Sequence, residues 1–299
     1  AGTLRGLTGT ARALRSLNPD AVYSAPEFAN LMMALALQLA GSKARFFPSF
    51  HAATALRSTG LGTRLAILAS RLVARRATRA ISVSEGVGQD LAQRGYPAEK
   101  IVTINNPLFS PGLGSGSARP WREALARMGD APLIGTAGRL VPVKDHQTLL
   151  RAFALLTQTR PARLVIFGEG PLADQLARKA EELGIADRVL FAGYVNDPAA
   201  CYEDLDLFVL SSTSEGFGNV LIEAMAAGVP VVSTDAPHGP REILQDGCLG
   251  TLVPVGDHRQ LAAAMAEGLD APVDTNLLAR RAADFTPEKI SDRYAALLA

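Results

Sequence analysis

The chain has 299 residues, of which 48% are hydrophobic and 20% are charged, a composition that is typical of a soluble globular protein with two domains. No secretory signal is visible, and the longest apolar run, Asn30–Gly41, is too short to span a bilayer and predicts a buried helix. Cys201 and Cys248 lack metal-ligand spacing, which favours reduced thiols in a cytoplasmic protein and predicts no metal site.

The formal net charge of +1 hides a division along the chain. Residues 1–110 carry 13 Lys and Arg against 5 Asp and Glu, whereas residues 111–299 carry 17 against 24. A basic half attracts nucleic acid, an anionic membrane or an anionic acceptor. No nucleic-acid motif accompanies it, so no nucleic-acid partner is expected and the last two alternatives are favoured. The amphipathic basic stretch Arg64–Arg79 fits a membrane-facing helix, and it equally fits a solvated helix face.

In chain order, the first half alternates short strand-like runs with helical patterns. We expect strands at residues 21–24, 44–47, 79–83 and 100–104, with an amphipathic helix at 61–77 between the second and third. Residues 105–121 are rich in Gly, Ser and Pro and indicate a linker. The predicted division is an N-terminal domain at 1–110, a linker at 111–120 and a C-terminal domain with a closing helix at 121–299.

After the linker, strands and helices alternate more regularly. Strands are predicted at residues 132–138, 163–168, 188–193, 205–210, 229–233 and 250–255. Helices are predicted near residues 145–158, 171–184, 218–227, 240–245 and 259–267. This alternation predicts an α/β fold with a doubly wound parallel sheet, which binds ligands at the carboxyl ends of its strands.

The segment SEGFGNVLIEAMAAGVP, residues 214–230, follows one such strand. It places Glu215 and Glu223 eight positions apart around a glycine turn, with Asn219 as the predicted N-cap of a helix. A helix N-terminus behind a glycine turn suits a phosphate group. A carboxylate beside a phosphate is unfavourable unless it accepts hydrogen bonds from sugar hydroxyls, so the pattern indicates a nucleotide sugar.

This segment resembles the signature of the family 4 retaining glycosyltransferases, whose fold is GT-B. Blocks similar to that family recur in its usual order at residues 135–153, 164–172, 188–195 and 206–244, and the tail resembles its closing helix. The resemblance implies two Rossmann-like domains, one for the nucleotide sugar and one for the acceptor. Family members begin with a strand and a glycine-rich loop that this sequence lacks, so we expect part of the N-terminal domain to be missing, or else shortened.

The resemblance also implies roles for particular residues. Arg139 and Lys144 bind the diphosphate of the donor, Glu223 binds the ribose, and Glu215 lies by the donor sugar as a catalytic residue. His51 matches a histidine near the reacting centre, although a lone histidine is often only structural. The other implied donor contacts, made largely through the backbone, are Gly193, Tyr194, Val195, Gly216, Phe217, Gly218, Asn219 and Val220. The glycines after strands have a simpler explanation as turns.

The implied reaction moves a glycosyl group from a UDP- or GDP-sugar to an acceptor hydroxyl with retention, in cell-surface polysaccharide or lipid-linked glycan assembly. The family needs neither cofactor nor divalent metal, and no Asp-x-Asp motif follows a strand here. Peripheral association with the inner face of a membrane is a further expectation, with a lipid-linked acceptor. Three alternatives stay open: a nucleotide-sugar-binding module without turnover, a GT-B nucleotide-sugar epimerase, and a structural or scaffold protein.

Overall fold

The computed structural model describes residues 2–52, 61–108 and 119–299, which fold as two compact units. Unit 1 runs up to Asn106 and includes Ile290–Ala299, and unit 2 extends from Pro107 to Lys289. The sequence assigned the whole closing helix to the C-terminal domain, whereas most of α12 (Pro287–Leu298) belongs to unit 1. The reason is apolar packing, because Ile290 of this helix is buried against Phe47 and Ile81. The predicted linker lies mostly outside the described residues.

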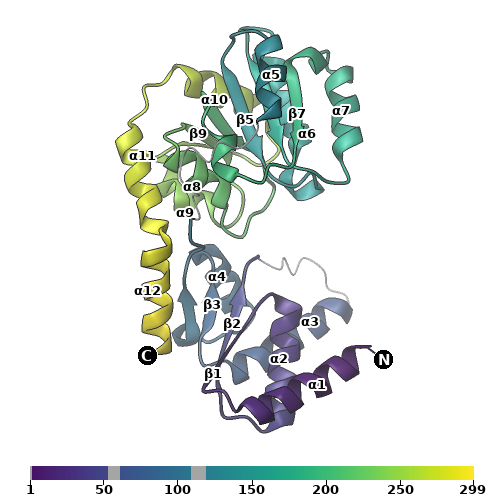
Figure 1. Ribbon diagram of the computed structural model, residues 1–299, viewed down its shortest axis with the longest axis vertical. Coiled ribbons are helices and arrows are strands. Elements are labelled where there is room, and N and C mark those ends of the chain that lie inside the picture. Colours follow the sequence, from purple (N-terminus) through teal and green to yellow (C-terminus); the bar gives the residue numbers. More distant parts are fainter. Residues whose placement is uncertain (1, 53–60, 109–118) are drawn as a thin grey trace. The chain divides into compact units, whose positions relative to one another are not determined.

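In unit 1, parallel strands are ordered β1-β2-β3-β4 (Figure 1). The strands are β1 (Ala21–Ser24), β2 (Arg45–Phe50), β3 (Ala80–Ser82) and β4 (Ile101–Thr103), and the helices are α1 (Gly2–Leu17), α2 (Glu27–Ala40), α3 (Leu61–Arg76) and α4 (Glu85–Gln93). Successive side chains of β2 point to opposite faces of the sheet. Phe47 therefore packs on α12, while Phe50 meets Tyr96. The predicted strands and amphipathic helix of this half are present within a few residues of their expected ends.

Unit 2 contains a parallel sheet with the order β10-β9-β8-β5-β6-β7. Its strands are β5 (Leu133–Ala137), β6 (Arg163–Phe167), β7 (Val189–Gly193), β8 (Leu207–Leu210), β9 (Val231–Thr234) and β10 (Thr251–Val253). The order reverses between β5 and β8, which is the arrangement of a Rossmann sheet. A ligand crevice is therefore expected at the carboxyl ends of these two neighbouring strands.

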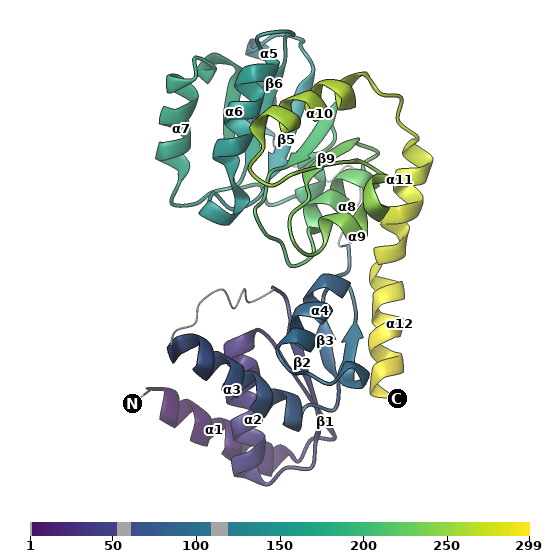
Figure 2. The ribbon, with the colours of Figure 1, turned by 180° about the vertical axis from the view of Figure 1, so that it is seen from behind.

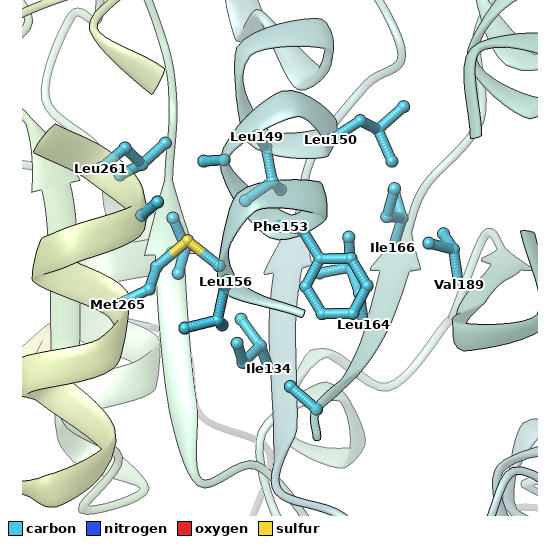
Figure 3. Packing of buried hydrophobic residues seen from close by; sticks show 14 of the residues in the cluster. Ile134, Leu149, Leu150, Phe153, Leu156, Leu164, Ile166, Val189, Leu261 and Met265 are labelled. Atoms are coloured by element: carbon cyan, nitrogen blue, oxygen red, sulfur yellow. The ribbon is translucent and has the colours of Figure 1, made fainter. Parts of the chain in front are cut away.

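The helices of unit 2 follow the strands as predicted. They are α5 (Pro120–Arg127), α6 (His146–Leu156), α7 (Ala173–Glu182), α8 (Asn219–Ala226), α9 (Pro240–Ile243), α10 (His258–Asp270) and α11 (Thr275–Ala282). Figure 2 shows α6 beside α10 on one face of the sheet. In Figure 3, Phe153 and Leu156 of α6 and Met265 of α10 pack over the strands, and all three are buried. This apolar layer fixes the positions of the loops that carry polar residues.

Side-chain caps begin several of the helices of unit 2. Asp145 and Asp257 cap α6 and α10 by accepting hydrogen bonds from backbone N–H groups of the first turn. The prediction that Asn219 caps α8 is wrong, because Gly218 is the N-cap at φ 106° and Asn219 is the first helical residue. A residue with a Cβ atom is strained at that positive φ, so glycine takes the position.

Candidate functional site

The loops after β5 and β8 meet where the strand order reverses. The backbone N–H of Thr213 donates to Val143 O at 2.8 Å, and Ser211 Oγ donates to Lys144 O at 2.9 Å. The N–H of Glu215 donates to Pro237 O at 3.2 Å, which ties the same loop to the segment after β9. Residues from three strand ends are thus held together by two backbone hydrogen bonds and one from a serine hydroxyl, so side chains on these loops have fixed starting points.

Lys144 and Glu215 form an ion pair across this junction. Lys144 Nζ lies 2.6 Å from Glu215 Oε1, and Ser212 Oγ donates to the same oxygen at 2.6 Å. The Lys144 side chain is 19% exposed and that of Glu215 is 10% exposed, so the pair is largely shielded from water. The sequence predicted separate ligand contacts for these two residues, and in the structure they form an ion pair with each other.

Glu223 lies one turn into α8 and is held by a buried tyrosine. Tyr202 Oη donates to Glu223 Oε2 at 2.6 Å, and the Tyr202 ring packs against Phe208 of β8 with centroids 5.4 Å apart. Burial raises the pKa of Glu223, while the Tyr202 hydrogen bond opposes that rise. Burial, with the negative charges of Glu223 and Asp197, also raises the pKa of Cys201 to about 12. Cys201 therefore remains a neutral thiol here.

Tyr202 and Ser212 were not predicted as site residues. Ser212 is recognisable in retrospect, because it stands three positions before Glu215 in the loop after a strand. Tyr202 follows the short 3-10 turn Pro198–Cys201, and nothing in the sequence links this turn to α8. Only the three-dimensional packing of the turn brings its hydroxyl to Glu223.

Arg139 follows β5 and is exposed. It has no ion-pair partner among the described residues, so its guanidinium is free to bind an anion. Gly138 precedes it, and the methylene groups of Lys144 pass 3.5 Å from where a Cβ at Gly138 would lie. The two predicted diphosphate-binding side chains therefore emerge from one loop on unit 2.

The predicted donor-contact residues on α8 and its turn divide into two kinds. The Phe217 side chain is buried and packs edge-on against Phe285 at 5.4 Å, so only its backbone is able to line a site. Gly218, Asn219 and Val220 begin α8, and no side chain caps this helix start. Gly216 lies between Glu215 and Phe217 and is partly buried. The backbone groups at the start of α8 therefore follow Glu215, the partner of Lys144, within a few residues along the chain.

The glycines after β6 and β7 have a packing role. The N–H of Gly168 donates to Gly193 O at 2.7 Å, and a Cβ at Gly168 would lie 2.0 Å from Gly138 O. The strand ends are therefore too close for any other residue at Gly168. Beyond Gly193, Tyr194 is 68% exposed, and its N–H donates to Glu169 Oε1 at 3.4 Å. Val195 is partly buried.

His51 belongs to unit 1, just beyond β2. Its Nε2 lies 3.1 Å from Ser49 Oγ. His51 is exposed on unit 1. Partial burial of its ring still lowers the pKa of His51, and the negative charge of Glu27 opposes this. His51 thus favours the neutral form at pH 7. The structure places it with Glu27 and Ser49 in unit 1, and Glu215 with Lys144 and Ser212 in unit 2.

Among the described residues, no group of three or more His, Cys, Asp or Glu is arranged to hold a metal ion. Within the same parts of the chain, no helix combines the length and apolar character needed to cross a membrane.

The fold is shared with solved glycosyltransferases. The crystal structure of Anabaena Alr3699/HepE with UDP-glucose matches with a TM-score of 0.81 at 24% identity, over 98% of this chain and 81% of that one. A UDP-forming α,α-trehalose-phosphate synthase from Burkholderia vietnamiensis matches with a TM-score of 0.82 at 15% identity, over 100% and 76%. At these identities the likeness concerns the fold, and it confirms the predicted GT-B class.

The family model of the glycosyl transferases group 1 matches residues 117–284, more than half of the chain. The chain belongs to this family, as its motifs predicted. A glycosyl transferase 4-like domain model matches residues 1–107. Lipopolysaccharide core biosynthesis glycosyltransferase LpsE of Rhizobium meliloti is 36% identical over 60% of this chain and 53% of its own length. A Campylobacter jejuni N-acetylgalactosaminyltransferase that acts on a diphospho-undecaprenol is 37% identical over 48% and 38%. The chain thus spans about half or less of these curated relatives.

Proposed function

We propose that this chain carries the donor site of a retaining glycosyltransferase that uses a nucleoside-diphosphate sugar. The observation that carries the proposal is the meeting of Arg139, Lys144, Glu215 and the start of α8 at the reversal of the unit 2 sheet. That position is the ligand crevice of doubly wound folds. Membership of the glycosyl transferases group 1 family supports a transferase over a binding module or an epimerase.

In this proposal Arg139 and Lys144 bind the diphosphate. A guanidinium binds two phosphate oxygens at once, and a lysine adds a compact positive charge. Lys144 is already paired with Glu215, so the diphosphate would attract the ammonium away from the carboxylate or share it. The backbone of residues 216–220 lies at the positive end of the α8 dipole and stabilises the same negative charge. These groups neutralise the leaving diphosphate without a metal ion, which is the electrostatic help that the reaction needs.

The two glutamates have different tasks. Glu223, held by Tyr202, would accept hydrogen bonds from the ribose hydroxyls. Glu215 would contact the transferring sugar, and Gly193, Tyr194 and Val195 would border the base. Release of Lys144 by the diphosphate leaves Glu215 with Ser212 and a free oxygen for a sugar hydroxyl. His51 of unit 1 would position the reacting hydroxyl of the acceptor or a group of the donor sugar.

For the donor we favour a UDP-sugar, with a GDP-sugar as the alternative that the test separates. One solved protein of this fold was crystallised with UDP-glucose, and another is named as a UDP-forming synthase. For the acceptor we favour a lipid-linked or cell-surface glycan, because LpsE acts in lipopolysaccharide core biosynthesis and the Campylobacter relative acts on a diphospho-undecaprenol. The basic α3, whose exposed Arg71 and Arg75 line a cavity with Lys100, suits an anionic membrane or acceptor.

The test is calorimetric titration of the chain with UDP, GDP and ADP in the presence of EDTA. We expect UDP to bind without metal, Glu223→Gln to weaken that binding, and Glu215→Gln to leave it nearly intact because UDP lacks the sugar. Binding that vanishes in EDTA and returns with Mg²⁺ would overturn the metal-free assignment. Equal losses in both variants would show that the two glutamates act together on the nucleotide.

A further inference from the structure

Three polar atoms of unit 1 are buried without a hydrogen-bond partner, and they line one cavity. They are Glu27 Oε1, Arg94 Nε and Tyr96 Oη, each unpartnered among the residues that the structure describes. Arg94 is 7% exposed and Tyr96 is 3% exposed. The cavity has a volume of about 220 Å³, and the rest of its lining consists mainly of apolar side chains, including Phe28, Leu31, Phe50 and Val73.

The side chains around this cavity are held by contacts that do not use the three atoms. Arg94 is the C-cap residue of α4, and its Nη2 donates to Ser70 Oγ at 2.8 Å while Nη1 lies 3.4 Å from Asp90 Oδ2. Its guanidinium carbon is 5.7 Å from the centre of the Phe50 ring. The Tyr96 ring meets Phe50 edge-on, with centroids 5.4 Å apart. The site is therefore pre-formed, and Arg94 Nε and Tyr96 Oη remain available.

Buried polar groups in native proteins are nearly always hydrogen-bonded, because an unsatisfied group loses its bonds to water on folding. Three such atoms on one cavity wall therefore indicate a polar occupant. Water alone would fill the volume with roughly seven molecules, at ~30 Å³ each. That is also the space of one ring that carries several hydroxyl groups.

The hydrogen-bonding groups of the cavity wall restrict the chemical class of ligand that would fit. Glu27 accepts hydrogen bonds, Arg94 donates them, and the Tyr96 hydroxyl does both. Burial, which is opposed by Arg94 and reinforced by Glu27, raises the pKa of Tyr96, so its proton stays in place at neutral pH. An anion would meet the Glu27 carboxylate, and a cation would meet the Arg94 guanidinium. A neutral ring with hydroxyl groups satisfies all three, and its C–H faces suit the rings of Phe50 and Tyr96.

We propose that this cavity, formed by α2, β2, α3 and the end of α4, binds the ring of a neutral sugar. The inference rests on the proposed function in one respect: the ring belongs to the acceptor, because the donor site lies on unit 2. Glu27 also acts on His51, the residue expected near the reacting hydroxyl. The acceptor in this proposal is therefore a glycan, and the sugar ring that the cavity binds is neutral.

The test is saturation-transfer NMR of the full chain with the methyl α-glycosides of glucose, galactose, mannose and N-acetylglucosamine. We expect at least one to bind, and Tyr96→Phe to weaken it by about five- to tenfold, the loss of one hydrogen bond. Glu27→Gln should weaken it as well. Because Tyr96 Oη has no partner among the described residues, Tyr96→Phe should leave the Tm of the free chain unchanged or raised. Tyr294→Phe, which removes a hydroxyl from a different cavity of unit 1, is the matched control and should bind normally.

Absence of binding by all four glycosides would overturn the proposal, as would equal binding by wild type and Tyr96→Phe. A lower Tm of free Tyr96→Phe would assign the hydroxyl a structural role and overturn it too. UDP titration of the same samples keeps the two proposals separate. Glycoside binding without nucleotide binding would refute only the proposed donor site, and nucleotide binding without glycoside binding would refute only this cavity.

Discussion

The two units differ in whether the polar side chains of their candidate sites have hydrogen-bond partners. In unit 2 both candidate carboxylates already have partners, since Glu215 accepts from Lys144 and Ser212, and Glu223 accepts from Tyr202. In the unit 1 cavity, Glu27, Arg94 and Tyr96 each keep a buried atom without a partner in the described chain.

Because of this difference, a bound ligand would gain free energy in a different way at each site. A ligand on unit 2 exchanges one set of hydrogen bonds for another, so the net gain per bond is small, while the loops stay ordered before it arrives. A ligand in the unit 1 cavity adds bonds that nothing else makes. We therefore expect mutations of the paired residues Lys144, Glu215 and Glu223 to change stability and binding together. Mutations that remove the unpartnered atoms of the cavity should change binding alone.

The largest expected effect concerns His146, a buried residue of unit 2 that is an exception to this comparison. His146 of unit 2 is 3% exposed, and its Nδ1 is buried with no partner in the described residues. Burial, reinforced by Lys144, lowers the pKa of His146 to about 4 from 6.5. The unfolded chain takes up a proton below pH 6.5 that the folded chain refuses, so stability is full above 6.5 and falls as the pH drops toward 4. The loss approaches about 3 kcal/mol.

Urea unfolding between pH 7 and pH 4, followed by the fluorescence of Trp121 in unit 2, measures this loss. Trp121 is the single tryptophan of the chain and packs edge-on against Phe167. His146→Phe should flatten the pH dependence, and the matched control His258→Gln should leave it unchanged. An unchanged profile in His146→Phe would show that this ring does not resist protonation in the folded chain.

The next effect compares two cations on one loop. Lys144→Ala leaves the largely buried Glu215 carboxylate with Ser212 alone, so we expect a loss of about 2 kcal/mol in unfolding free energy. Arg139→Ala removes an exposed charge that has no ion-pair partner among the described residues, and it should change stability by less than about 0.5 kcal/mol. Both should weaken UDP binding by about 1.5–3 kcal/mol. Adding Glu215→Gln to Lys144→Ala should restore most of the stability, and failure of that rescue would contradict the ion-pair explanation.

A smaller effect concerns the raised pKa of Glu223. The unfolded carboxyl ionises near pH 4.5, while the folded one resists ionisation, so the folded chain loses stability as the pH rises from 4.5 through the raised pKa. Glu223→Gln removes this loss and should be more stable than the wild type at pH 7. UDP affinity should move in the opposite direction. A variant that loses both stability and affinity would indicate that the charged carboxylate supports the fold.

Much of the fold could be predicted because the signals are local. Apolar runs marked the strands of unit 2, and several of these runs end in glycine. The capping of α8 could not be predicted, because Asn219 is a good N-cap by type and only the φ of Gly218 decides the position. The closing helix was assigned to the wrong unit because its apolar face does not specify which sheet it covers.

The candidate site was predicted less completely, for a similar reason. The sequence motif contains Arg139, Lys144, Glu215 and Glu223, but it does not contain their partners. Tyr202 reaches Glu223 from a turn 21 residues earlier, and Lys144 reaches Glu215 across 71 residues. Tyr96 and Arg94 stand in a turn between two predicted elements, where burial is not expected. Contacts of this kind depend on packing and not on the pattern of any one segment.

The last prediction concerns the opposite charges of the two halves. Arg71 and Arg75 are exposed on α3, whereas Arg76 is engaged with the backbone oxygens of Ser42 and Ala44. If the basic face meets an anionic bilayer, each arginine near the surface contributes about 1 kcal/mol. Arg71→Gln combined with Arg75→Gln should therefore weaken binding to vesicles that contain phosphatidylglycerol by about thirtyfold, and salt should weaken wild-type binding.

The matched control is Arg151→Gln with Arg280→Gln, which removes the same charge from exposed positions of unit 2. Co-sedimentation with vesicles of phosphatidylglycerol and of phosphatidylcholine alone separates a charge effect from apolar adsorption. Exposed charges act over about 10 Å in 0.1 M salt, so charges far from the membrane contact should have little effect. Equal losses in the two double variants would show instead that only the net charge matters. A loss confined to Arg71 and Arg75 would locate the membrane contact on α3, on the same unit as the proposed sugar cavity. A glycan acceptor anchored in that membrane would then meet both surfaces on one unit.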